Sequence, residues 1–114
     1  MTDIELTRLT AEAMGIPFRE LNVLGSTFIV ADTDEGNLIY LHGHGACSVY
    51  NPLKDDAQAM ALVKKFELRC RTYIKREWQV WAPDQAETTD ASNGDLNRAI
   101  CECLAKMQQA KAKP

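Results

Sequence analysis

The chain has 114 residues, of which 46% are hydrophobic and 25% are charged, a composition typical of one soluble globular domain. No apolar run approaches the roughly 18 residues that a membrane span needs, and the acidic, polar N-terminus does not resemble a secretory signal peptide. The net charge is −3, yet residues 54–77 hold seven bases and four acids, so positive charge is concentrated in one central stretch. We therefore expect a cytoplasmic protein with no membrane partner.

The first half of the chain predicts one helix and two strands. Residues 3–14 favour a helix that begins at Thr2 or Asp3 and ends at Gly15, because Pro17 forbids its continuation. Residues 27–31 and 37–41 are short runs rich in β-branched and aromatic residues. The polar, Gly-containing turn between them predicts that these two strands form a hairpin. Residues 42–48, in which glycine and histidine alternate, are expected to form a loop.

The second half predicts a helix, a second hairpin and a final helix. Asp55 or Asp56 is expected to cap the first of these helices, whose apolar stripe would contain Met60, Val63 and Phe66. Ala59 and Leu62 are expected to lie beside this stripe. The ranges 68–75 and 78–82 are expected to be the two strands of a hairpin. A mobile surface loop is expected over 83–94, because this range contains no large apolar residue.

Ser92 or Asn93 is expected to cap the final helix, at about 95–110, and residues 111–114 are expected to fray. Its apolar residues recur at the spacing of one helix face and are Leu96, Ile100, Cys103, Leu104 and Met107.

The expected order of elements is α-β-β-α-β-β-α within a single domain over 1–110. Hairpins imply antiparallel strands, and a sheet needs its apolar faces covered. We therefore predict an α+β fold: a three-layer α/β/α sandwich with a roughly four-stranded antiparallel sheet. A two-layer α+β fold with one open sheet face is the alternative.

The range 68–75 alternates with the period of a strand. Its even positions are apolar or small and are expected to be buried. Only one tryptophan of the next strand can share a face with the odd positions, and Trp81 is the candidate. The proposed partner-binding residues are Arg69, Arg71, Tyr73, Lys75 and Trp81. Such a surface suits an acidic protein partner or, with the aromatic rings, phosphates and bases. The long basic side chains could equally form a solvated face over apolar neighbours.

Three other patterns are too weak to assign a site. His42, His44 and Cys47 give three potential zinc ligands with no evident fourth. The glycines between them do not match a phosphate-binding loop. Cys47 with a nearby histidine lacks the local signature of a nucleophile and base. We assign no metal, no cofactor, no catalytic residue and no enzymatic activity.

The four cysteines, Cys47, Cys70, Cys101 and Cys103, are expected to be reduced, because the sequence suggests no export. Buried free cysteine behaves as a small apolar residue. These four thiols are therefore expected to contribute to packing and not to form disulfides.

Three stretches together resemble the phage "ABA sandwich" proteins, small proteins of phages and prophages. They are Ala11-Glu12-Ala13-Met14-Gly15, Tyr50-Asn51-Pro52-Leu53 and Ala99-Ile100-Cys101-Glu102-Cys103-Leu104. The chain has Tyr50 where the family commonly has tryptophan, and Leu53-Lys54 where it often has Ser-Thr. The resemblance implies a layered fold and a cytoplasmic setting in a bacterial host cell, and it implies no activity.

The sequence therefore predicts a phage or prophage accessory protein that acts by binding a host or phage protein. The alternative is a nucleic-acid-binding module that uses the basic strand face over 69–75. The sequence leaves the oligomeric state open.

Overall fold

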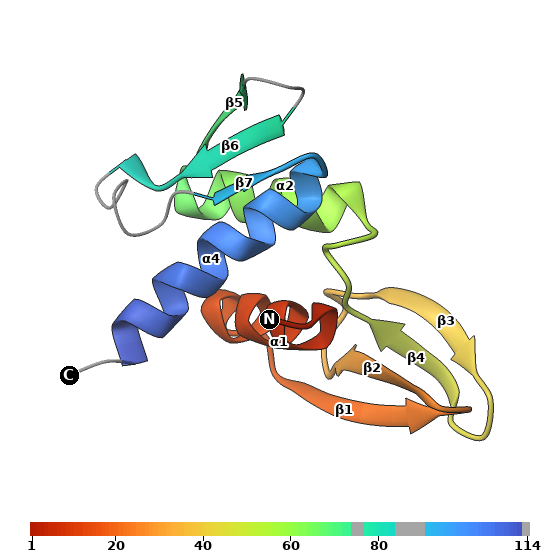
Figure 1. Cartoon of the computed structure of the whole chain (residues 1–114). Coiled ribbons are helices and arrows are strands. Elements are labelled where there is room, and N and C mark those ends of the chain that lie inside the picture. Colours follow the sequence, from red (N-terminus) through yellow and green to blue (C-terminus); the bar gives the residue numbers. More distant parts are fainter. Residues whose placement is uncertain (74–76, 84–90, 113–114) are drawn as a thin grey trace. The chain divides into compact units, whose positions relative to one another are not determined.

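The computed structural model describes residues 1–73, 77–83 and 91–112 and divides into two compact units, Met1–Asn51 and Pro52–Pro114. The described residues form three helices and two antiparallel sheets, one of four strands and one of three (Figure 1). The predicted α+β class with a four-stranded antiparallel sheet is confirmed. The three-layer stacking of these elements stays a prediction.

In the first unit, α1 (Asp3–Met14) has the predicted bounds and caps. The Thr2 hydroxyl accepts a hydrogen bond from the Glu5 N–H, which satisfies one of the orphan donors of the first turn. Gly15 ends the helix in the left-handed conformation, with φ 73°. These signals are local, so the sequence alone places the helix correctly.

The sheet of the first unit differs from the predicted hairpin. Its strands are β1 (Phe18–Val23), β2 (Ser26–Ala31), β3 (Asn37–Leu41) and β4 (Gly45–Val49). They pair in the order β1-β2-β4-β3, so β2 and β3 are not neighbours. The prediction that 27–31 and 37–41 form a hairpin is therefore wrong. The four predicted strands, at 27–31, 37–41, 68–75 and 78–82, are divided between the two sheets.

Two tight turns create the strands that the sequence did not predict. Leu24 and Gly25, with φ 51° and 83°, connect β1 to β2 in the positive-φ geometry that suits two-residue hairpins. Gly43 and Gly45 also have positive φ, and the His44 N–H donates to the Leu41 carbonyl across the turn. The range expected to be a loop over 42–48 is therefore a turn followed by β4.

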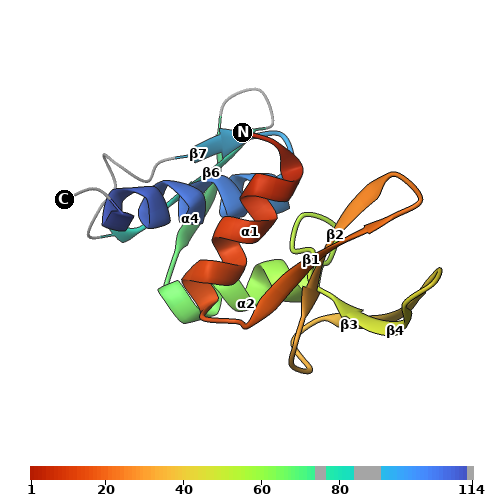
Figure 2. The same cartoon turned by 90° about the horizontal axis from the view of Figure 1, so that it is seen from below.

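The core of the first unit has one cluster on each face of the sheet. Helix α1 packs on one face, where Ala11, Ile16, Ile29 and Ala31 are buried. On the other face Val23, Val30, Leu41 and Cys47 pack together. Figure 2 shows α1 beside the beginning of β1, while both hairpins of the sheet, β1–β2 and β3–β4, extend beyond the helix.

In the second unit, α2 (Asp56–Phe66) begins after Asp55, whose carboxylate accepts from the Gln58 N–H as predicted. The apolar stripe predicted for α2 is wrong at Met60, whereas Val63 and Phe66 are half-buried. Ala59 and Leu62 are 1% and 0% exposed, whereas Met60 is 43% exposed. The buried stripe is therefore rotated about the helix axis relative to the predicted one.

The second sheet consists of β5 (Arg69–Tyr73), β6 (Glu77–Trp81) and β7 (Ala91–Asn93), in that order. The hairpin of β5 and β6 is confirmed. Strand β7 lies inside the range 83–94 that was expected to be a loop, because Ala91 pairs with Val80 at the centre of the sheet. Residues 84–90 of that expected loop lie outside the described residues.

Helix α4 (Leu96–Ala112) begins two residues later than the predicted caps allow. The capping side chain is that of Asp95, which accepts from the N–H groups of Asn97 and Arg98. The Asn97 amide also donates to Asp56 at 2.8 Å, which joins the first turns of α4 and α2. The helix continues through Lys111, where fraying was expected. Its buried residues are Ala99, Ile100, Cys101, Cys103, Leu104 and Ala105.

Among the described residues, the cysteines form no disulfide, and Cys47, Cys101 and Cys103 are buried as expected. Burial, with a smaller contribution from Asp95, raises the pKa of Cys101 to about 12. This thiol is therefore protonated at neutral pH and packs as an apolar group. Within the described residues, no helix is long and apolar enough to cross a membrane.

Candidate binding surface

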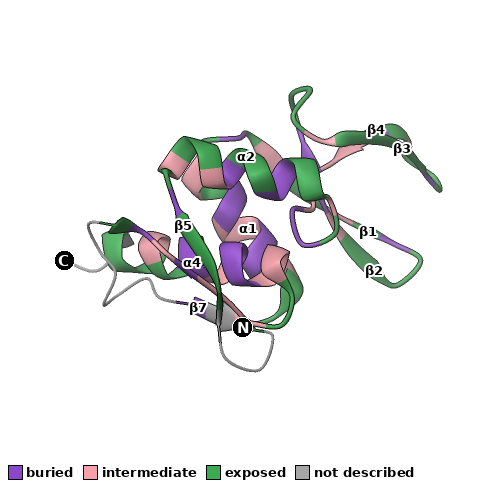
Figure 3. Cartoon of the chain, turned by 90° about the horizontal axis from the view of Figure 1, so that it is seen from above, coloured by how far each residue is buried: buried purple, intermediate pink, exposed green. Residues whose placement is uncertain are grey.

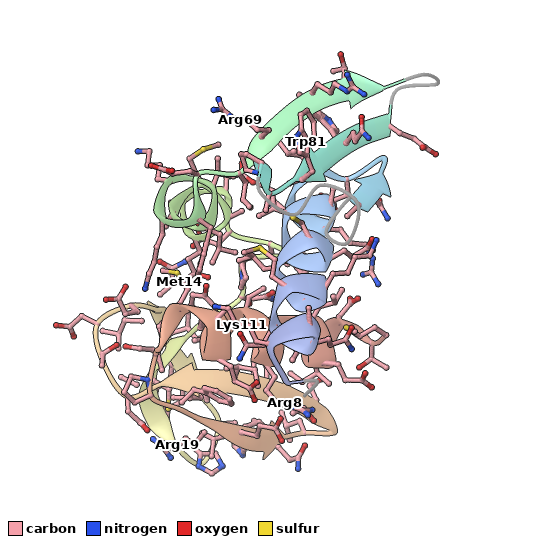
Figure 4. All side chains as sticks on the ribbon, turned by 90° about the vertical axis from the view of Figure 1, so that its left-hand side faces the viewer. Arg8, Met14, Arg19, Arg69, Trp81 and Lys111 are labelled. Atoms are coloured by element: carbon pink, nitrogen blue, oxygen red, sulfur yellow. The ribbon has the colours of Figure 1, made fainter. Side chains whose placement is uncertain are left out.

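The outer face of the second sheet brings together the predicted basic and aromatic residues. Arg69 lies opposite Trp81, and Arg71 lies opposite Gln79. Because directly opposed residues of an antiparallel pair project to the same side, these four side chains share one face. We call this set the Arg–Trp face. Figure 4 shows Arg69 and Trp81 on the neighbouring strands β5 and β6.

Arg71 is held in place by two neighbours on this face. Its Nε donates to the Gln79 Oε1 at 2.6 Å, and its guanidinium lies over the Trp81 ring, 5.3 Å from the centroid. A cation over an indole ring contributes about 0.5–1 kcal/mol at an exposed site. The guanidinium is therefore pre-ordered, which lowers the entropy that a bound partner would have to remove.

The opposite face of the same sheet is anchored to the core of its unit. Val80 and Ala91 are paired partners and are 0% and 2% exposed. Helix α4 packs against the strands that carry them, β6 and β7. The Arg–Trp face is therefore built on a rigid support.

A pocket of about 500 Å³ lies next to the Arg–Trp face. Its apolar lining comes from Phe66, Leu68 and Met107, and its charged lining comes from Glu67 and Arg69. Arg69 belongs to both the pocket and the Arg–Trp face. A ligand could thus place an apolar group in the pocket while a neighbouring acidic group contacts an arginine.

The even positions of β5 differ from the prediction. Leu68 is buried, but Cys70 and Thr72 are exposed, although they project to the same side as the buried Val80. The reason is that β5 is an edge strand, whereas α4 packs mainly on β6 and β7. Partial burial nevertheless raises the pKa of the Cys70 thiol.

The structure does not describe two of the predicted site residues completely. The side chain of Tyr73 and all of Lys75 lie outside the part that the structure describes. Gln79, which orients Arg71, was missed by the sequence analysis. The alternation of Glu77, Gln79 and Trp81 along β6 places Gln79 on the same face as Trp81. Only the register against β5 shows that Gln79 lies opposite Arg71.

The histidine and cysteine residues near the β3–β4 turn form no comparable site. Cys47 is buried, and its Sγ donates to the backbone carbonyl of His44 at 3.7 Å. Among the described residues, no group of three His, Cys, Asp or Glu side chains could hold a metal ion.

Comparisons of the chain with protein-family models, with curated proteins and with solved structures each give no match.

Proposed function

We propose that the chain is a protein-binding module whose Arg–Trp face recognises an acidic segment of a partner protein. The observation that carries this proposal is the pre-ordered Arg71, which is stacked on Trp81 and hydrogen-bonded to Gln79. Oriented guanidinium groups bind carboxylates through charge-assisted hydrogen bonds. Tryptophan and arginine are also the residues most often found at the energetic centres of protein interfaces.

The adjacent pocket suggests a second feature of the proposed partner, an apolar residue. An extended segment that places a leucine or phenylalanine beside the apolar lining would bring its flanking residues near Arg69. The favoured ligand is therefore an acidic segment with one large apolar residue. The apolar anchor would supply affinity, and the carboxylates would supply orientation and selectivity.

Nucleic-acid binding through the same face is the alternative, and one observation weighs against it. Arg71 lies over the Trp81 ring, so a stacked base would compete with it for that position.

The test uses a synthetic acidic peptide with one central leucine and follows the emission of Trp81 in a Trp78→Phe background. Because the chain has two tryptophans, this background leaves Trp81 as the sole indole. We expect saturable binding that becomes about tenfold weaker after Arg69→Glu and Arg71→Glu together. The matched control, Lys64→Glu with Lys111→Glu, reverses two exposed charges of the same unit and should bind normally.

A parallel titration with single-stranded oligonucleotide separates the two functions. Oligonucleotide binding that falls steeply with salt, with no peptide binding, would replace the proposal with the alternative. Equal loss of peptide binding in both charge-reversal variants would show that the Arg–Trp face has no specific role.

We further propose, from the resemblance of the three sequence stretches, that this module is a cytoplasmic accessory protein of a phage or prophage. The proposal predicts phage genes on both sides of its own gene. A neighbourhood of bacterial housekeeping genes would contradict it.

A further inference from the structure

Strand β3 forms one edge of the first sheet and exposes apolar side chains. Leu38 and Tyr40 are 73% and 77% exposed, and Ile39 between them is 41% exposed. Figure 3 shows this strand as exposed along most of its length. Within the residues that the structure describes, no strand pairs with the outer edge of β3. Such an edge presents backbone donors and acceptors together with apolar side chains to another strand.

The other edge strands carry features that oppose strand pairing. Strand β1 has Arg19 and Glu20, which form ion pairs with Asp32 and Arg8 at 3.1 and 2.9 Å. Strand β5 has exposed Arg69 and Arg71, and β7 is only three residues long. Charges and short length are the usual protections of an exposed edge. Strand β3, with the sequence Asn-Leu-Ile-Tyr-Leu, has neither a charge nor a proline.

We propose that the outer edge of β3 pairs antiparallel with β3 of a second copy of this chain, so that one sheet runs through a two-fold dimer. With Ile39 on the two-fold axis, Leu38 lies opposite Tyr40 of the second copy, and Tyr40 lies opposite Leu38 of the second copy. The four side chains then form one apolar cluster on a single face of the joined sheet. Cross-strand apolar pairs of this kind stabilise antiparallel sheets.

The charges at the two ends of β3 favour a second copy over an unrelated strand. Exposed Asp34 and Glu35 precede the strand, and exposed His42 and His44 follow it. Antiparallel pairing about Ile39 brings the turn before β3, with Asp34 and Glu35, to the end of the interface where the 42–44 turn of the second copy lies. An imidazole N–H can donate a hydrogen bond to a carboxylate oxygen. The segment is therefore complementary to itself in this orientation.

The same contrast between edges limits the assembly to two copies. Each chain has one β3 edge, and a symmetric contact uses that edge in both partners. The opposite edge of the same sheet is the charged strand β1, so the joined sheet ends there. The expected product is a closed dimer and not a growing fibre.

The test is sedimentation equilibrium of the full chain over a wide range of concentrations. We expect a monomer–dimer equilibrium. Leu38→Lys with Tyr40→Lys should weaken dimerisation about tenfold or more, because like charges then face each other across the pair. Both positions are highly exposed, so the substitutions should leave the fold intact. The matched control, Leu24→Lys with Met60→Lys, adds the same charge at exposed apolar residues outside β3 and should dimerise normally.

A charge exchange tests the orientation. Asp34→Lys alone should weaken the dimer, and adding His44→Glu in the same chain should restore it. The two positions lie beyond opposite ends of β3, whose five residues span about 14 Å, so a restoring contact is between copies. A monomer at every concentration, dimerisation unchanged by the lysines, or an edge that captures only unrelated extended peptides would each overturn the proposal.

Discussion

The two sheets each leave one long edge beyond the helix that covers them, and the residues on those edges differ. Helix α1 packs against β2, and α4 packs against β6 and β7, which leaves β3 and β5 largely uncovered. Strand β5 carries arginines, whereas β3 carries exposed leucine, isoleucine and tyrosine. The side chains on an open edge strand therefore determine which kind of partner that edge can bind. Arginines oppose strand pairing and favour acidic side chains, and an uncharged apolar edge favours another strand.

A substitution that separates β3 from its own sheet should lower the stability of the chain more than the other changes considered. A Cβ added to Gly36, just before β3, would lie 2.7 Å from backbone atoms of Ser48 and Val49. Gly36→Ala must therefore push β3 away from β4. We expect the free energy of unfolding, measured by urea denaturation, to fall by about 1–3 kcal/mol, and dimerisation to weaken with it.

Gly94→Ala is the matched control for this change. A Cβ at Gly94 meets no atom within 4 Å, so the free energy of unfolding should be nearly unchanged. Equal effects of the two substitutions would contradict the close approach of β3 to β4.

Selective alkylation of Cys70, which should leave the stability unchanged, tests the exposure of β5. Cys70 is exposed, whereas Cys47, Cys101 and Cys103 are buried. An alkylating reagent should therefore modify Cys70 alone in the folded chain, and mass spectrometry should find a single labelled site. Because the pKa of Cys70 is raised, its thiolate fraction at neutral pH is small, and the rate should increase as the pH rises.

The control for the labelling is Cys70→Ser, which should take up no label until the chain is unfolded. Comparable modification of Cys101 in the folded chain would show that β6 and α4 do not pack as described.

Local signals in the sequence were sufficient to place α1 and α2 and the odd positions of β5. The caps at Thr2, Gly15 and Asp55 satisfy backbone groups within one turn, so the sequence alone predicts Gly15 and narrows each of the two N-caps to two residues. The period of two in 68–75 correctly placed Arg69 and Arg71 on one face with Trp81. The role of that face in binding stays a prediction.

Strand order and burial depended on contacts between distant residues, which the sequence did not reveal. Gly43 and Gly45 predict a loop by composition, but their positive φ values make the tight turn from β3 into β4. The turn at Leu24 lacks the asparagine or aspartate that usually precedes glycine there. Cys70 was expected to be buried, but its exposure follows from which strands α4 packs against.

Hydrogen–deuterium exchange at low and high protein concentration tests the contrast between the two edges most directly. We predict that amides of β3, over Leu38–Leu41, become more slowly exchanging as the concentration rises, while amides of β5 keep the same rates. Exchange in β3 that is independent of concentration, or an equal slowing in β5, would contradict the account.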